Sequence, residues 1–466
     1  MTLLLKSKHA DNQTPIVGVF VALLVLLCTI AYGFLYQLHR SQTVTLWAIF
    51  AALFVAYCLF LRPTIAQKYY YPLLLAAVVF RVVSLSAIPN LSDDFYRFVW
   101  DGRLWISGIN PFLHLPIHFF DGTYVGQAIA GIDTTLLGQL NSPHYYSVYP
   151  PVCQYIFALA AKLSKGNLWT NVVWLKVILL SFELGNLALL NKFRLSNTLT
   201  HQNVLQYALC PLIIVELVGN IHFEAACIFF MLLAVYYLHQ QKNTYSAVAL
   251  GLAISVKLLP LIALPLLFRR LGVVQTLRYS AIAISIFLVS FLPLLNLHLW
   301  QILVSVALYF HSFSFNASIF YVVRWALNTL SSTDLSAFAG YGMAVITFGG
   351  VLYYAFQEKK ASTPNKTNLS AFMLGLLFVW SLYLACATTI HPWYVAPLVA
   401  WSVFTPYRFP LLWSLLVMGS YAAYNKQPYT ENNSILFIEY ALVGAYALWE
   451  WINKDVDNKT PYATKV

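Results

Sequence analysis

The chain has 466 residues, of which 60% are apolar and only 9% are charged, whereas soluble proteins average roughly 45–50% and 25%. This composition excludes an ordinary soluble enzyme, and apolar runs of about 20 residues predict a chain made mostly of membrane-spanning helices. The formal net charge of +11 does not indicate a nucleic-acid partner, because the 27 Lys and Arg are scattered singly, without a basic stripe or a binding motif.

In chain order, the apolar segments predict an all-α polytopic membrane protein with about twelve full spans. The expected spans lie near residues 16–38, 44–61, 70–88, 168–190, 203–219, 222–239, 277–297, 335–356, 369–388, 392–406, 410–425 and 434–452. We expect residues 1–466 to form a single integral-membrane domain, in which residues 1–69 contribute two extra spans. Residues 245–268 are a further apolar run that Lys257 and Pro260 interrupt, which predicts a short helical hairpin with Lys257 at its tip.

The basic residues predict which side of the membrane each loop faces. With the N-terminus in the cytoplasm, sixteen of the 27 Lys and Arg lie in inner loops and seven lie in the longer outer segments. The seven outer residues are Arg40, Arg97, Arg103, Lys162, Lys165, Arg324 and Lys426. We therefore expect an integral protein of a bacterial inner membrane, with a cytoplasmic N-terminus and its functional loops facing outward.

The longest polar stretch, residues 89–166, follows the third span on the outer face and is too long for a plain connector. Residues 94–106 have helical spacing, and residues 149–163 are apolar but too short to cross a bilayer. We interpret both as helices that lie along the membrane surface. A second outer segment, residues 297–332, has a similar character.

The densest polar cluster lies in this outer loop, at residues 92–103. Asp93 and Asp94 could deprotonate a hydroxyl group or bind a cation, and aromatic neighbours could raise the pKa of a carboxyl group toward a useful range. The alternative interpretation is structural, because acidic side chains also stabilise the first turn of a helix. The sequence leaves both interpretations open.

Three polar residues, Asn220, His222 and Glu224, lie at the outer end of an expected span. Ionisable groups at membrane depth cost ~2.5–3.5 kcal/mol each on insertion scales, so they normally face a cavity or one another. His222 and Glu224 have metal-ligand chemistry, but no third ligand stands at a suitable spacing, and no metal site is predicted. A structural hydrogen-bonded pair is the alternative.

Three other outward-facing segments carry residues of uncertain role in the sequence. Lys257 is placed to meet an anionic phosphate, although snorkelling of its ammonium to the interface is an alternative. Residues 391–394 either line a site or belong to the aromatic belt of the membrane interface. Arg324 could bind an anion or a neighbouring carbonyl group.

Taken in order along the chain, these motifs resemble those of the polytopic GT-C glycosyltransferases. The run from Asp93 through Arg97 and Asp101 to residues 108–112 looks like the first outer loop of that superfamily, and most like that of the mannosyltransferase-like group that uses a polyprenyl-phosphate sugar. Later motifs of that group are resembled, in the same order, by residues 149–154, 219–224, 256–260, 315–318 and 391–394. The resemblance covers about residues 70–410.

The resemblance implies a hexosyltransferase, most often a mannosyltransferase, that moves the sugar from a polyprenyl-phosphate donor to an acceptor hydroxyl on a lipid or glycan, with inversion. Asp93 or Asp94 would be the general base, and one base suffices because a phosphate leaving group carries its own charge. The residues expected to bind donor or acceptor are Arg97, Asp101, Arg103, Asn220, His222, Glu224, Lys257, Arg324, His391, Trp393 and Tyr394. No cofactor is implied, a divalent cation is compatible with the chemistry but not predicted, and membrane lipids complete the expected partners.

The chain departs from that superfamily in two ways. The candidate catalytic loop follows the third span instead of the first. Because two spans are added before it, the loop remains on the outer side of the membrane. The acidic pair is Asp93-Asp94, where relatives have Asp-Glu or Asp-x-Asp, so the base is not fixed by the motif.

Two other functions fit part of the pattern. A secondary transporter or lipid flippase suits twelve spans, but no internal repeat is visible and the polar residues gather toward one face instead of the midplane. An enzyme like the O-antigen ligases or polymerases would be expected to place its charged residues in a late outer loop, whereas residues 89–166 are early.

Overall fold

The computed structural model describes residues 2–294, 313–331, 333–357, 369–425 and 429–457, with side chains from residue 15 to residue 453. Within these ranges the structure has no strand, and Phe315 and Thr389 form an isolated parallel bridge. The predicted all-α fold is therefore confirmed.

The α-helices in chain order are α1 (Thr2–Leu35), α2 (Thr43–Phe60), α3 (Pro63–Lys68), α4 (Tyr70–Val82), α5 (Asp94–Ile106), α6 (Thr134–Gln139), α7 (Pro151–Ser164), α8 (Leu168–Leu195), α9 (His201–Ala208), α10 (Pro211–Ile213), α11 (Glu224–His239), α12 (Asn243–Val256), α13 (Phe268–Leu271), α14 (Val273–Ser290), α16 (Ile319–Leu330), α17 (Ser336–Gln357), α18 (Leu369–Cys386), α19 (Ala396–Ser402), α20 (Phe409–Leu416) and α21 (Asn433–Asp457). Shorter 3-10 or π turns are Pro116–Phe119, Ile214–Gly219, Leu259–Ala263, Pro265–Leu267, Leu292–Leu294, Pro392–Val395 and Val417–Asn425.

Seven helices in the described part of the chain are long and apolar enough to cross a membrane, so the chain is an integral membrane protein. They are Pro15–Leu35, Thr43–Phe60, Leu168–Leu195, Val273–Leu294, Ser336–Gln357, Leu369–Cys386 and Asn433–Asn453. An eighth span results if α9 and Pro211–Gly219, bent by 44°, are counted as one.

The prediction of about twelve full spans is not confirmed. Helices α4, α11 and α12 have only 13, 16 and 14 residues, which is shorter than the ~20 residues that a bilayer requires. The expected spans 392–406 and 410–425 are each divided between a short α-helix and a 3-10 turn. Hydropathy detects apolar runs, but it does not detect where the helix stops within them.

The outer loop has the expected helices. The helix predicted at residues 94–106 is α5, and the apolar segment 149–163 corresponds to α7. These two helices pack closely at Gly102, where a Cβ atom would lie only 2.4 Å from the carbonyl oxygen of Phe157. Of the predicted second outer segment, residues 297–312 and 332 lie outside the described residues, and most of the remainder forms α16.

The interruption predicted at Lys257 is also present. Helix α12 ends at Val256, and Lys257 has an extended backbone with φ −154° and ψ 139°. The second arm of the expected hairpin consists mainly of 3-10 turns, because Pro260 and Pro265 lack the N–H groups that a regular α-helix needs.

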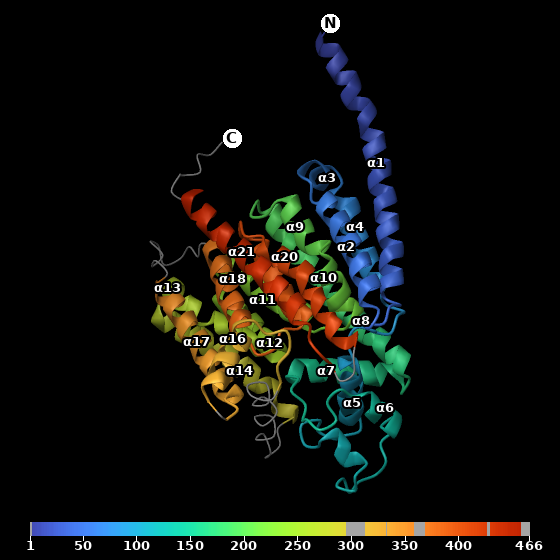
Figure 1. Ribbon diagram of the computed structural model, residues 1–466, viewed down its shortest axis with the longest axis vertical. Helices are drawn as coiled ribbons and strands as arrows, with labels where there is room; N and C mark the ends of the chain where they lie inside the picture. The colour runs from blue at the N-terminus through green and yellow to red at the C-terminus, as the bar shows by residue number, and fades with distance from the viewer. Residues whose placement is uncertain (1, 295–312, 332, 358–368, 426–428, 458–466) are drawn as a thin grey trace.

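Figure 1 shows how these elements are arranged. Helix α1 begins and α21 ends at one end of the molecule, whereas α5 and α6 lie at the opposite end. The outer-loop helices therefore gather at one end of the helical body.

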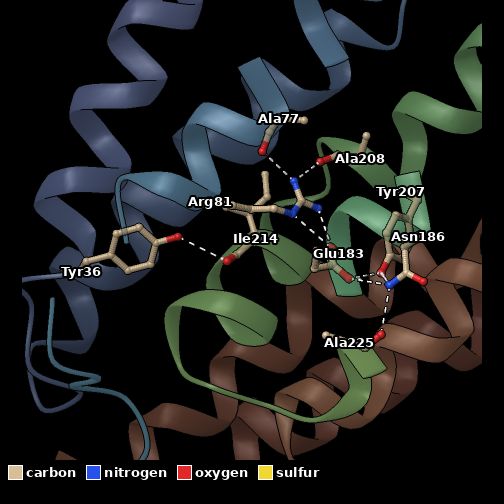
Figure 2. A network of polar contacts seen from close by, with 9 residues as sticks. All are labelled: Tyr36, Ala77, Arg81, Glu183, Asn186, Tyr207, Ala208, Ile214 and Ala225. Atoms are coloured by element: carbon tan, nitrogen blue, oxygen red, sulfur yellow. Dashed lines mark hydrogen bonds and ion pairs between the residues drawn. The ribbon is translucent and has the colours of Figure 1, made fainter. Parts of the chain in front are cut away.

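A buried ion pair joins α4 to α8 within the helical body (Figure 2). Arg81 Nε and Nη2 donate to Glu183 Oε2 at 3.1 and 3.0 Å, and both side chains are fully buried. Arg81 Nη1 donates to the carbonyl oxygens of Ala77 and Ala208, each at 2.8 Å. Because Ala208 is the last residue of α9, this guanidinium also fixes the bend between α9 and α10.

The second oxygen of Glu183 extends the same network (Figure 2). Glu183 Oε1 accepts hydrogen bonds from the Tyr207 hydroxyl at 2.6 Å and from Asn186 Nδ2 at 2.8 Å. Asn186 Nδ2 also donates to the carbonyl oxygen of Ala225 at 3.1 Å, on the first turn of α11. The network thus connects α4, α8, α9 and α11.

Candidate functional site

Asp93 and Asp94 lie at the start of α5, and their side chains have different partners. Asp93 forms an ion pair with Arg40, from the α1–α2 connection, with 2.5 Å between Oδ2 and Nη2. The Arg40 guanidinium also lies 4.5 Å from the centroid of the Tyr424 ring. Asp94 accepts a hydrogen bond from the Asn141 amide at 2.7 Å. Asp93 is thus paired with a cation, whereas Asp94 has a neutral partner.

Burial raises the pKa of the Asp94 carboxyl group above its ordinary value of 3.8. His222 and the Asn141 amide lower this pKa, while the negative charges of Asp93 and Glu224 raise it. These neighbours show that Asp94 lies within electrostatic range of a segment far along the chain. A carboxylate in this setting accepts a proton more readily than an exposed aspartate does.

Residues 219–224 follow a distorted helix end. Ile214–Gly219 form a π-helical turn, a geometry that is frequent at functional sites. Ile221 then has a positive φ of 62°, a conformation that costs a β-branched residue on the order of 1–3 kcal/mol. The chain turns back here, so His222 Nδ1 lies 3.0 Å from the carbonyl oxygen and 3.2 Å from the Oε2 of Glu216.

The Glu216 carboxylate is fully buried and is held by several donors. It accepts hydrogen bonds from the Tyr421 hydroxyl at 3.0 Å and from Asn220 Nδ2 at 3.3 Å, in addition to the His222 contact. His222 itself is only 3% exposed. Its Nε2 atom has no hydrogen-bond partner among the described residues, which is unusual for a buried polar atom.

Lys257 and Glu224 form an ion pair between the end of α12 and the start of α11. The Glu224 side chain is 4% exposed, but the Lys257 side chain remains 34% exposed. The ammonium lies 4.0 Å from the centroid of the Tyr394 ring. Because an ammonium has three donors, Lys257 can contact Glu224 and still bind an anion.

Four aromatic rings from three separate segments form a continuous stack. His222 lies on Trp393 at 3.6 Å, Trp393 lies on His391 at 4.4 Å, and His391 lies on Phe315 at 4.9 Å between centroids. Both faces of Trp393 are covered, so this ring supports the two histidines instead of offering a face to a ligand. Burial lowers the pKa of His391 to about 3, with smaller electrostatic contributions from His222 and Lys257, and the His391 ring is neutral at pH 7.

Three predicted binding residues of the outer loop have partners within that loop. Arg97 pairs with Asp101 at 2.8 Å and donates to two loop carbonyl groups at 3.1 and 2.8 Å. Asp101 also accepts a hydrogen bond from Gln154 at 2.9 Å. Arg103 donates to two further loop carbonyl groups at 2.5 and 2.8 Å. These contacts shape residues 89–166, and a role in substrate binding stays a prediction.

Arg324 lies on α16 and contacts its own segment. It donates to Ser314 Oγ at 3.0 Å, and its guanidinium lies 4.6 Å from the centroid of the Tyr321 ring. The neighbouring Asn316 bonds Glu431 through its backbone N–H at 2.5 Å and Glu439 through its side-chain amide at 3.3 Å. These contacts hold the segment that supplies Phe315 to the ring stack.

The comparison with protein families decides the class of the chain. Residues 17–271 match the family model described as alpha-(1->6)-mannopyranosyltransferase, N-terminal domain, which is more than half of the chain. The chain belongs to this family. It is therefore a membrane glycosyltransferase of the GT-C-like mannosyltransferase kind. Neither the curated proteins nor the solved structures contain a match to the chain.

The matched region contains most of the candidate site residues of this mannosyltransferase. Asp93, Asp94, residues 219–224 and Lys257 all fall within residues 17–271, whereas residues 391–394 lie beyond it. A family of mannosyltransferases does not favour the transporter or flippase interpretation.

Two residues that contact the candidate site were not among the site residues expected from the sequence. Arg40 was predicted only as one of the basic residues of the outer segments, because the sequence around it contains no motif that indicates a contact with Asp93. Glu216 could have been included by the rule that ionisable groups at membrane depth face a cavity or one another. Among the described residues, no group of three or more His, Cys, Asp or Glu side chains could hold a metal ion.

Proposed function

We propose that this mannosyltransferase moves a mannosyl group from a polyprenyl-phosphate donor to an acceptor hydroxyl, with inversion, and that Asp94 is the general base. The observation that carries the proposal is the electrostatic interaction of Asp94 with His222 and Glu224, together with the ion pair between Glu224 and Lys257, all within the family-matched region. Glu224 thus links a proton acceptor to a cation, and transfer from a phosphate ester requires both.

The surroundings of the two aspartates favour Asp94 over Asp93 as the base. Asp93 is paired with Arg40 at 2.5 Å, so the guanidinium already occupies its Oδ2 atom. Asp94 is half-buried, and its pKa is raised by burial. In this proposal Asp93 and Arg40 hold the start of α5, and Asp94 takes the proton.

The proposed step exchanges one C–O bond for another. The acceptor oxygen attacks the anomeric carbon of the sugar while its proton passes to Asp94. The bond from the anomeric carbon to the phosphate oxygen breaks, and its electron pair leaves with the lipid phosphate. Lys257, whose ammonium is partly exposed beside Glu224, would stabilise the charge on that phosphate.

The family's description adds two expectations about the substrates. If this chain forms the same alpha-(1->6) linkage, the attacking group is the primary hydroxyl at C6 of an acceptor sugar. An alpha product reached with inversion requires a donor in which mannose is linked to phosphate in the beta configuration. We further propose that the site faces outward from a bacterial inner membrane, where lipid-linked donor and acceptor are both present.

The experiment is a transfer assay with purified enzyme. Beta-linked and alpha-linked polyprenyl-phosphate mannose would each be incubated with a mannoside acceptor, with and without chelator, and transfer of mannose would be measured. We expect activity with the beta-linked donor alone. Use of the alpha-linked donor, or an absence of transfer from both, contradicts the proposal.

Two variants test the base. We expect Asp94→Asn to reduce kcat by about 10³-fold, within the usual range for a general base, and Asp93→Asn to reduce it much less. Both proteins should unfold at temperatures near that of the wild type. Equal losses in the two variants, or a larger loss in Asp93→Asn, contradict the assignment of Asp94.

A further inference from the structure

The buried pair of Glu216 and His222 has no assigned role in the proposed transfer. The Glu216 carboxylate is fully buried at the end of a broken helix. Burying a carboxylate is costly unless hydrogen bonds satisfy it. Here Asn220 and Tyr421 donate to the Glu216 carboxylate, while His222 Nδ1 lies 3.2 Å from its Oε2 and 3.0 Å from the main-chain carbonyl oxygen of Glu216.

The position of His222 Nδ1 fixes which ring nitrogen carries a proton. Both groups that Nδ1 meets, the carbonyl oxygen and the carboxylate of Glu216, are hydrogen-bond acceptors, at 3.0 and 3.2 Å. Nδ1 must therefore be the donor. In the neutral imidazole, the lone pair is then on Nε2.

The ring stack and the Glu216 contacts together hold the His222 ring in one orientation. Trp393 covers one face of the His222 ring at 3.6 Å, with the two rings inclined by only 14°. His391 supports the other side of Trp393 at 4.4 Å. A flip of His222 would break the contacts of Nδ1 with Glu216. Trp393 thus fixes the plane of the ring, and Glu216 fixes the direction of its edge.

The Nε2 atom is the end of His222 that is left for a ligand. It is buried and has no hydrogen-bond partner among the described residues. His222 and Asp94 interact electrostatically. A hydroxyl group can pair with Nε2 whether or not this nitrogen carries a proton, because a hydroxyl group both donates and accepts hydrogen bonds.

We infer that Glu216 is a positioning residue, which holds the His222 ring so that Nε2 forms a hydrogen bond with a hydroxyl group of the sugar or the acceptor. This inference rests on the proposed transfer for the identity of the ligand. Glu216 acts through His222 and does not touch the substrate. Its contribution is the orientation of the ring, and an uncharged acceptor of similar shape can supply it.

Three variants separate orientation from folding. Glu216→Gln keeps a side-chain acceptor beside Nδ1, Glu216→Leu leaves Nδ1 with the main-chain carbonyl oxygen alone, and Tyr421→Phe removes a different hydrogen bond of the same carboxylate. We expect kcat/KM to fall by about 10- to 100-fold in Glu216→Leu, the loss of one buried hydrogen bond, and by less than about 3-fold in the other two. The inference is overturned if Glu216→Gln loses as much as Glu216→Leu, or if Glu216→Leu retains wild-type activity.

A second measurement needs no substrate. Nitrogen-15 NMR of the full-length protein labelled at histidine, with His222 identified by its loss in His222→Gln, reports the protonation of each ring nitrogen. We expect a protonated Nδ1 in the wild type and in Glu216→Gln, and a changed Nδ1 signal in Glu216→Leu. An unprotonated Nδ1 in the wild type overturns the inference. An inactive wild type with the expected NMR pattern would instead count against the proposed function.

Discussion

Two groups of buried charges in this protein differ in how completely they are satisfied. In the Arg81–Glu183 network, all three guanidinium nitrogens and both carboxylate oxygens have partners within the chain (Figure 2). In the cluster near the start of α5, His222 Nε2 has no partner among the described residues, and Lys257 remains 34% exposed.

This difference separates a structural network from a candidate site. A buried polar group without a partner costs free energy. Asn186 Oδ1, beside the Arg81–Glu183 pair, also has no partner among the described residues, so His222 Nε2 is distinguished by its interaction with Asp94 as well as by its missing partner. The Arg81–Glu183 network satisfies its own charges and connects four helices. Near Asp94, the side chains of His222 and Lys257 are each held by a neighbouring residue, but His222 Nε2 and the partly exposed Lys257 ammonium can still bind another molecule.

The largest expected effect concerns the structural network. Arg81→Met leaves Glu183 charged and unpaired in the interior, which should destabilise the protein by about 3–5 kcal/mol. The double variant Arg81→Met/Glu183→Met should recover much of this loss, because it removes both charges. Thermal unfolding in detergent measures the effect. If the single variant is as stable as the wild type, the network does not have the structural role given to it here.

A large effect on turnover is expected at Lys257. Lys257→Ala should lower kcat/KM by about 10²–10³-fold, because the phosphate loses a cation as its charge develops. Lys257→Arg, which keeps the charge, is the matched control and should retain more activity. A similar rate in Lys257→Ala and the wild type at limiting donor argues against a phosphate contact.

A moderate effect is expected at Arg103, whose Nη1 and Nη2 atoms have partners within the chain while Nε has none among the described residues. Arg103 donates to two loop carbonyl groups and is 7% exposed. Arg103→Met should lower stability by about 1–3 kcal/mol, the cost of buried acceptors left unpaired, while the KM for donor changes little. A selective rise in that KM at unchanged stability would return Arg103 to the binding site.

The smallest expected effect concerns pH. Burial raises the pKa of Asp94 above 3.8, so the base is protonated and kcat/KM falls as the pH drops through that raised pKa. The pKa of His391 is lowered to about 3, so His391 stays neutral over the same range. His391→Phe, which keeps a ring in the stack, should leave the acid limb of the pH profile in place. If the acid limb of the pH profile moves in His391→Phe, the ionisation that causes this limb belongs to His391 and not to Asp94.

Much of the local structure was predictable from residue patterns. The helix at residues 94–106 and the break at Lys257 both follow from short-range features, namely helical spacing and the polar interruption of an apolar run. The order of the motifs also predicted the family that residues 17–271 match. The number of spans was not predictable, because apolar runs around residues 201–219 and 392–425 contain helix ends that hydropathy does not register.

The sequence by itself determined that this is a helical membrane protein with mannosyltransferase motifs, because composition, periodicity and motif order are properties of neighbouring residues. Only the tertiary structure decided which charges meet. Arg40 pairs with Asp93, Arg81 with Glu183, and His222 with Glu216. The first two pairs join distant segments, and the third depends on the π turn and the positive φ of Ile221. Electrostatic pairing depends on distance in space, which helix packing sets and which no local pattern records.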